Sequence, residues 1–327
     1  MRKNIAIIMG GYSSEVEISL KSGNIVYQNM PKEKYNSYRV HILKNKWVAL
    51  DDFENEYEIN KHDFSFEINR EKIIFDCVFN AIHGNPGEDG TILAYFNLIG
   101  LKHTSASFYQ MALTFNKRDC LSVVKPYGIK TATSYYLDKG DVVNVDEIVA
   151  KVGLPCFIKP NNAGSSFGIS KAKTKEEILP AIEKAYKEDS QILIEEFLDG
   201  AEITIGVFQY KGETKVLPMT EIVSENEFFD YEAKYLGKSQ EITPARISDD
   251  LHKKLEKTAK QVYEILNMSG FSRSEYIIVN NEPHFLEMNT VPGLTSASII
   301  PQQAAAAGIS LPELFENAIE MALKNNI

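Results

Sequence analysis

The sequence has few cysteines and no long apolar run, and these shortages exclude several classes of protein. Its three cysteines, Cys77, Cys120 and Cys156, have neither the paired spacing of a zinc site nor the even number of a disulfide framework. Two of them lie in apolar stretches, so we expect buried, reduced thiols, with a nucleophilic cysteine as the alternative. The apolar segment 5–9 is too short for a membrane span and ends in Gly-Gly instead of a cleavage site. We therefore expect no membrane segment and no targeting peptide.

An excess of basic residues is also absent. The chain carries 35 lysines and arginines against 45 aspartates and glutamates, which gives a formal net charge of −10. Because a nucleic-acid-binding protein presents a basic surface, we expect no nucleic-acid partner. An anionic ligand would need metal ions or a few well-placed cationic side chains to offset the negative field.

The length and the order of the predicted elements indicate two or three compact units. A chain of 327 residues exceeds one ordinary core, and 44% hydrophobic and 24% charged residues are typical of a globular protein. Up to about residue 102, strands alternate with helices, which predicts an open parallel α/β layer. Ser13 or Ser14 could cap its first helix, and a single helix is expected over 107–128. The polar segment 224–244 is a candidate functional loop.

A lysine and a glycine- and serine-rich loop follow one buried strand. Lys159 ends the apolar run PCFIK, and Ser165 and Ser166 lie beyond it between Gly164 and Gly168. Glycines let a backbone approach a phosphate, successive N–H groups and hydroxyls can hold it, and lysine supplies a point charge. The order of residues is not that of a Walker loop. The segment is either a phosphate loop or an exposed turn beside a lysine.

Acidic residues follow a second buried strand. Glu195, Glu196, Phe197 and Leu198 end the run QILIEEFL, and Glu202 lies beyond the next turn. The end of a strand can offer backbone groups to an adenine edge, and an acid a few residues later can hold ribose hydroxyls. The alternative is a pair of solvated charges on a surface turn.

Two oxygen-bearing side chains share one face of the last predicted strand. Glu287 and Asn289 are two residues apart, and Glu275 joins them if its strand pairs with theirs as a hairpin. One or two carboxylates plus substrate phosphates are how proteins hold Mg²⁺. The alternative is an amphipathic edge hairpin with Leu286 and Met288 facing the core. That alternative does not explain the small, polar sequence VPGLTSAS that follows at once.

Together these segments resemble the D-alanine–D-alanine ligase family of the ATP-grasp superfamily. The stretches MGGYSSEVEISLKSG, AIHGNPGEDGT, IKPNNAGSSFGIS, DYEAKY and EMNTVPGLTSAS occur in the family's order and at comparable spacing over nearly the whole chain. The resemblance implies an α/β and α+β protein with an N-terminal Rossmann-like (pre-ATP-grasp) domain before a two-lobed ATP-grasp fold. It implies domains over 1–102, 103–197 and 198–327, the second a small ATP-grasp subdomain and the third the catalytic one.

The resemblance also implies an activity and its location. The family joins two D-alanine molecules to D-alanyl-D-alanine with ATP, through an acyl phosphate, for peptidoglycan precursor synthesis. The expected substrates are therefore ATP and D-alanine, the expected metal is two Mg²⁺ (or Mn²⁺) ions, and the expected state is a cytoplasmic homodimer.

Residue roles are likewise implied by the resemblance. Metal ligands are implied for Glu275, Glu287 and Asn289. Contacts to ATP or the transferred phosphate are implied for Lys117, Lys159, Ser166, Glu195, Glu196, Phe197, Leu198, Glu202 and Lys234. Catalytic or substrate roles are implied for Glu15, Ser165, Arg273, Gly293, Tyr235 and Ser298. Among these, Glu15 would hold the first ammonium, and Arg273 and the Gly293 N–H would stabilise the oxyanion. His83 would lie near the first substrate, with a structural histidine as the alternative.

Two details concern specificity, and rival interpretations remain. Relatives that make D-alanyl-D-lactate lack the tyrosine found here at Tyr235, so a dipeptide product is expected. Family members commonly carry Arg-x-Asp where this chain has Arg273, Ser274 and Glu275, which leaves metal affinity or preference open. The rivals are another ATP-grasp carboxylate–amine ligase and a non-catalytic nucleotide-binding regulator. An NAD-binding protein is a weaker rival because GGYSSE lacks the full G-x-G-x-x-G.

Overall fold

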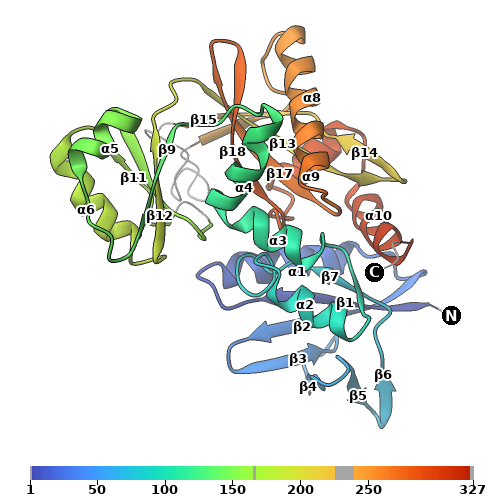
Figure 1. Ribbon diagram of the computed structural model, residues 1–327. Helices are drawn as coiled ribbons and strands as arrows, with labels where there is room; N and C mark the ends of the chain where they lie inside the picture. Colours follow the sequence, from blue (N-terminus) through green and yellow to red (C-terminus); the bar gives the residue numbers. More distant parts are fainter. Residues whose placement is uncertain (1, 165–166, 225–238, 325–327) are drawn as a thin grey trace.

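Three main sheets and their helices make up the protein (Figure 1). The computed structural model describes residues 2–164, 167–224 and 239–324. The first sheet has the spatial order β4 (Glu56–Glu58), β3 (Lys46–Leu50), β2 (Tyr35–Leu43), β1 (Lys3–Gly10), β7 (Cys77–Asn80), β8 (Lys102–His103). A two-stranded sheet, β5 (Phe66–Ile68) and β6 (Glu71–Ile73), lies beside it. The parallel layer is confirmed for β2, β1, β7 and β8, whereas β3 and β4 extend it as antiparallel strands.

Helices cover both faces of this first sheet. They are α1 (Val16–Asn29), α2 (Thr91–Leu98) and the C-terminal helix α10 (Leu311–Lys324). Ile7 of β1 packs in one apolar cluster with Val26 of α1 and Phe315 of α10, and Ile8 packs in another with Phe96 of α2. Successive side chains of a strand point to opposite faces, so a central strand covered on both sides reads as a continuous apolar run.

The turn between β1 and α1 differs from the predicted helix cap. Helix α1 begins at Val16, and Glu15 occupies the N-cap position without a capping side-chain hydrogen bond. The Ser13 hydroxyl donates to the carbonyl oxygen of His83 at 3.0 Å and accepts from the N–H of Glu15 at 3.2 Å. The predicted cap by Ser13 or Ser14 is therefore wrong, because this hydroxyl joins two loops instead.

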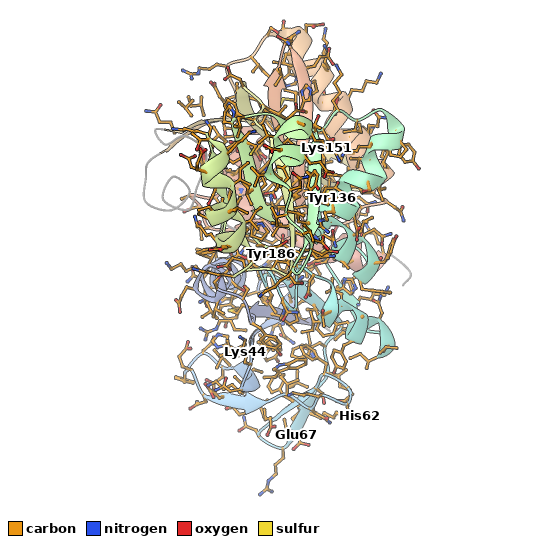
Figure 2. All side chains as sticks on the ribbon, turned by 60° about the vertical axis from the view of Figure 1, so that its left-hand side comes forward. Lys44, His62, Glu67, Tyr136, Lys151 and Tyr186 are labelled. Atoms are coloured by element: carbon orange, nitrogen blue, oxygen red, sulfur yellow. The ribbon has the colours of Figure 1, made fainter. Side chains whose placement is uncertain are left out.

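The second sheet forms a separate lobe with its own core. Its spatial order is β11 (Ser170–Ala172), β10 (Cys156–Pro160), β12 (Gln191–Glu196), β9 (Ser134–Asp138), and all pairs are antiparallel. Helices α5 (Val145–Val152) and α6 (Lys175–Ala185) pack on it. Figure 2 brings this lobe forward, with Tyr136, Lys151 and Tyr186 on it and His62 and Glu67 at the far end of the first sheet's domain.

The third sheet is antiparallel and adjoins both others. Its spatial order is β16 (Ser239–Ile242), β15 (Thr220–Ser224), β13 (Ala201–Tyr210), β17 (Ser272–Val279), β18 (Glu282–Asn289), with β14 (Glu213–Val216) beside β13. Helix α8 (Asp249–Ile265) packs on this sheet, and α9 (Ile299–Ala306) follows it in the chain. Among residues 2–164, 167–224 and 239–324, no helix combines the length and the apolar character needed to cross a bilayer.

The single helix expected over 107–128 is wrong, since the chain forms two. They are α3 (Phe108–Phe115) and α4 (Lys117–Val124), followed by a 3-10 turn at Lys125–Tyr127. Asn116 adopts an extended backbone, and its side-chain oxygen accepts from the N–H of Asp119, which caps α4. The break places Lys117 at the first position of α4, where its Nζ donates to the carbonyl oxygen of Ala163 at 2.8 Å.

The cysteines are buried and free, as expected. Burial raises the pKa of Cys77 and of Cys120 to about 12. A thiolate is the nucleophilic form, so these two thiols are unsuited to nucleophilic catalysis.

Candidate active site

The hairpin of β17 and β18 brings the three predicted metal ligands together. Glu275 is the cross-strand partner of Glu287, and Arg273 is the partner of Asn289. Arg273 Nη1 lies 2.7 Å from Glu275 Oε1, and Asn289 Nδ2 donates to the same oxygen at 3.3 Å. A register shift between Glu275 and Tyr276 interrupts the regular pairing there. The predicted hairpin is confirmed, and the role of its oxygen atoms as metal ligands stays a prediction.

The chemistry of this donor set fits Mg²⁺. Two carboxylates and one amide oxygen are hard ligands, and Mg²⁺ in nucleotide sites adds phosphate and water oxygens to such a set. Within the described part of the chain, no cluster of three or more His, Cys, Asp or Glu side chains is placed to hold a metal. The amide of Asn289 and the oxygens of a bound ligand would therefore have to complete the coordination. Lys117 Nζ, at 3.1 Å from Glu287 Oε2, partly compensates the negative charge.

An ion pair between a half-buried lysine and a buried glutamate links the predicted phosphate lysine to the predicted adenine segment. Lys159 Nζ lies 2.7 Å from Glu195 Oε2, and the Ser134 hydroxyl donates to Glu195 Oε1 at 3.3 Å. Burial opposes the charge on Lys159, but the carboxylates of Glu195, Glu287 and Glu275 outweigh it and raise the pKa of the ammonium. Lys159 thus stays cationic in a half-buried position.

The rest of the predicted adenine segment is the stretch of chain that connects β12 of the second sheet to β13 of the third. The Glu196 carboxylate accepts from the N–H of Thr133 at 2.7 Å, which holds the end of β12 to the start of β9. The Phe197 ring lies under Lys171, whose Nζ is 3.9 Å from the ring centroid. Leu198 is half-buried beyond β12, and Glu202 is half-buried near the start of β13. Their role in binding adenine and ribose stays a prediction.

A cavity of about 290 Å³ collects Glu15, Arg273, Gly293 and Ser298, the described residues that were predicted to have catalytic or amino-acid-binding roles. It lies where the first and third sheets' domains meet, and the glycine-rich loop of the second sheet reaches it through Gly164. Its lining includes Glu15, His83, Glu88, Gly164, Glu241, Arg273, Asn289, Gly293 and Ser298. The predicted site residues Ser165, Ser166, Lys234 and Tyr235 lie outside the described residues.

Glu15 and His83 form the wall that comes from the first sheet. Both are buried, and a Cβ added at Gly164 would come within 2.7 Å of Glu15 Oε2, so the loop backbone lies directly against this carboxylate. His83 Nε2 lies 3.3 Å from the Ser22 hydroxyl. Burial lowers the pKa of His83, while the nearby Glu15 carboxylate opposes that shift.

The turn after β18 supplies another part of the cavity wall. A Cβ added at Gly293 would meet Ser298 Oγ at 2.8 Å, so only glycine fits without displacing that hydroxyl. Ser298 Oγ also lies 2.8 Å from Thr295 Oγ1, and Ser298 is the N-cap residue of α9. The run VPGLTSAS therefore places a backbone N–H and hydroxyls at the cavity.

Glu88 is a cavity residue that the sequence analysis missed. Its carboxylate accepts from the N–H groups of Gly84 at 3.1 Å and Thr290 at 3.2 Å, joining the first sheet's loop to the turn after β18. Burial, and then the charge of Glu15, raises the pKa of Glu88 to about 7. An acid between glycines is typical of a surface turn, so no local signal marks Glu88 as buried.

Comparisons with known proteins agree with this geometry. Residues 4–106 match the family model described as D-ala D-ala ligase N-terminus, and residues 123–320 match the one described as D-ala D-ala ligase C-terminus. A D-alanine–D-alanine ligase of Flavobacterium johnsoniae is 69% identical over 321 residues, which cover 98% of this chain and 99% of the relative.

Solved structures of ligases have the same fold. The VanG D-Ala:D-Ser ligase of Enterococcus faecalis matches with a TM-score of 0.88 at 32% identity, covering 98% of this chain and 100% of that chain. A D-alanine–D-alanine ligase of Bacillus anthracis complexed with ATP matches with a TM-score of 0.79 at 28% identity, covering 98% of each chain. The protein therefore has the ATP-grasp architecture and belongs to the D-alanine–D-alanine ligase family.

Proposed function

We propose that the protein uses ATP to join two D-alanine molecules into D-alanyl-D-alanine. The observation that carries the proposal is the position of Asn289, which lines the substrate-sized cavity and also touches Glu275 in the carboxylate hairpin. A carboxylate held in the cavity would thereby lie next to groups suited to a triphosphate. Holding two reactants in this way supplies much of the advantage in an ATP-driven ligation.

In the first step, a carboxylate oxygen of the first D-alanine attacks the γ-phosphorus of ATP. The bond from that phosphorus to ADP breaks, and an acyl phosphate forms. Glu15 holds the ammonium of this D-alanine, and Lys117 and Lys159 contact the phosphates together with Ser166. Such a transfer depends mainly on placement and charge compensation, which these groups provide. Glu275, Glu287 and Asn289 would hold two Mg²⁺ or Mn²⁺ ions, which neutralise phosphate charge when bound.

In the second step, the neutral amine of the second D-alanine attacks the acyl carbon. The bond from that carbon to the phosphate oxygen breaks, phosphate leaves, and the nitrogen gives up one proton to water as the amide forms. Negative charge develops on the former carbonyl oxygen, and the Arg273 guanidinium and the Gly293 N–H stabilise it. Ser298 and Lys234 hold the second substrate and the transferred phosphate. We assign Ser165 and Tyr235, which lie outside the described residues, to the substrate site together with Glu15, as the family resemblance implies.

We assign binding of the nucleotide base to the chain segment that connects β12 of the second sheet to β13 of the third. Because the Glu195 side chain pairs with Lys159, we assign adenine recognition to the backbone of Glu195 to Leu198 and the ribose hydroxyls to Glu202. The three expected domains, 1–102, 103–197 and 198–327, remain our proposed division of the chain. We further propose a cytoplasmic homodimer whose product enters peptidoglycan precursor synthesis.

Phosphate release from ATP with Mg²⁺ tests this function. D-alanine, L-alanine, D-alanine plus D-serine and D-alanine plus D-lactate are compared in parallel, and the products are identified by mass. We expect release with D-alanine and a dipeptide of the mass of D-alanyl-D-alanine. Binding of ATP without release or product in the presence of D-alanine would contradict the proposal and would favour a different pair of carboxylate and amine.

A further inference from the structure

Besides Glu15 and Glu88, the second of which accepts from backbone N–H groups, a third carboxylate lines the cavity, and no step above uses it. Glu241 lies on β16, at the edge of the third sheet, and belongs to the lining together with Arg273 and Ser298. Its cross-strand partner on β15 is Ile222, whose side chain is buried. Glu241 is therefore a charged side chain at a cavity, although its cross-strand partner is a buried apolar one.

One oxygen of this carboxylate is held by Gln302 of α9, the helix whose N-cap residue is Ser298. Gln302 Nε2 donates to Glu241 Oε2 at 2.8 Å and to the carbonyl oxygen of Ala297 at 2.7 Å. Both hydrogens of the amide are thus used, which fixes Gln302 between the turn and the strand. The other oxygen, Glu241 Oε1, accepts no hydrogen bond from the described residues. The carboxylate is anchored on one side, and its second oxygen is available to a ligand.

The surroundings of Glu241 favour a cationic partner. Burial raises the pKa of Glu241, and the hydrogen bond from Gln302 and then the charge of Arg273 only partly offset this. A partly desolvated carboxylate gains most from a charge-assisted hydrogen bond with a ligand cation. Each of two amino acids in the cavity would bring one ammonium group, and Glu15 accounts for one of them.

We infer that Glu241 receives the ammonium group of the second amino acid and orients it. The ammonium then gives up one proton to water, and the resulting neutral amine attacks the acyl carbon. This inference rests on the proposed function and adds a specificity-determining residue to it. Glu15 and Glu241 then divide one cavity between two ammonium groups. An amine nucleophile is favoured over a hydroxyl nucleophile of similar size, since a hydroxy acid leaves the carboxylate without its cation.

The test compares two nucleophiles in wild-type protein and in Glu241→Gln. Dipeptide formation is measured against D-alanine concentration with ATP saturating. Hydroxamate formation is measured with D-alanine and hydroxylamine, a small neutral nucleophile that traps the acyl phosphate. We expect Glu241→Gln to raise the KM for the second D-alanine about tenfold or more, since a hydrogen bond to a charged group contributes about 1.5–3 kcal/mol. The KM for ATP and the rate of hydroxamate formation should not change.

Two further variants separate this role from structural damage. Glu213→Gln makes the same change at an exposed position of β14 in the same sheet and should match the wild type. Gln302→Ala removes the anchor of Glu241 and should raise the second KM by less than Glu241→Gln does. An unchanged second KM in Glu241→Gln, or an equal loss of dipeptide and hydroxamate, would overturn the inference. A wild-type protein that forms neither product would contradict the proposed function itself, and the inference with it.

Discussion

Glu195 and Glu88 are equally withdrawn from solvent but have opposite surroundings. Their exposed fractions are 3% and 7%. Glu195 has the ammonium of Lys159 at 2.7 Å, whereas Glu88 accepts from backbone N–H groups and has the Glu15 carboxylate as its charged neighbour. A carboxylate loses its hydration in both places, and only one of them regains a full opposite charge.

The two carboxylates therefore do different things. Glu195 keeps the half-buried Lys159 charged and aligned beside the segment where we place the nucleotide. Glu88 ties the loop after β7 to the turn after β18, and so aligns the walls of the cavity that come from two domains. Burial alone does not determine whether a carboxylate compensates a cation or joins two segments of the chain. The groups that surround the carboxylate determine it.

Removing Lys159, the cation that pairs with Glu195, should have the largest effect on turnover and stability. In Lys159→Ala we expect turnover to fall by about two orders of magnitude or more, because a charged contact to the phosphates is lost. Stability should fall by about 3–5 kcal/mol as well, because Glu195 stays buried without its partner. Phosphate release and urea denaturation measure the two effects separately.

A double variant distinguishes these effects. Lys159→Ala with Glu195→Gln should regain much of the lost stability, because no uncompensated charge remains, but it should regain no turnover. Near-normal turnover in Lys159→Ala alone would remove Lys159 from the mechanism. Glu195 would then have no role in catalysis through Lys159.

Glu88→Gln should have a smaller effect that appears mainly in the pH dependence of stability. The pKa of Glu88 is raised from 4.5 to about 7 in the folded protein. Its contribution to stability is therefore fully present below about pH 4.5 and is lost as the pH rises through about 7. Between these limits, the free energy of unfolding of the wild type should fall relative to Glu88→Gln by on the order of 3 kcal/mol.

Urea unfolding at several pH values on both sides of this window measures the difference. The amide of the variant accepts fewer hydrogen bonds than a carboxylate, so a constant offset is expected and only the change with pH is informative. Parallel curves for the wild type and Glu88→Gln would mean that Glu88 does not titrate in this range. The two buried carboxylates would then differ less than their partners suggest.

Local sequence patterns predicted the hairpin and the strand ends, but not the cavity. Alternation placed Glu287 and Asn289 on one face, and the buried run before Lys159 marked a strand end. The break between α3 and α4 was missed because the expected helix continued across Asn116, whose cap is visible only with the structure.

Residues from distant segments explain the larger omissions. Glu88 and Glu241 are more than a hundred residues apart in the chain, and both line the cavity only because three sheets meet there. Neither periodicity nor turn chemistry contains that information. The family and its fold were predicted correctly, since several ordered motifs together are specific where each alone was ambiguous. The individual roles of the site residues stay predictions.

The smallest effect is expected at Glu275, a buried carboxylate that resembles Glu195 in having a cationic neighbour. Arg273 Nη1 lies 2.7 Å from its Oε1, so Glu275→Asp keeps the charge and withdraws the carboxylate by about one bond length, roughly 1.5 Å. We expect turnover to be kept, since the family commonly has aspartate here, with at most a changed Mg²⁺ dependence. Phosphate release over a range of Mg²⁺ and Mn²⁺ concentrations measures both, with Glu275→Gln as the matched variant that loses the charge and should lose turnover. Complete loss in Glu275→Asp would show that the reach of the glutamate is required, and that Arg273 and Asn289 are spaced for the longer side chain.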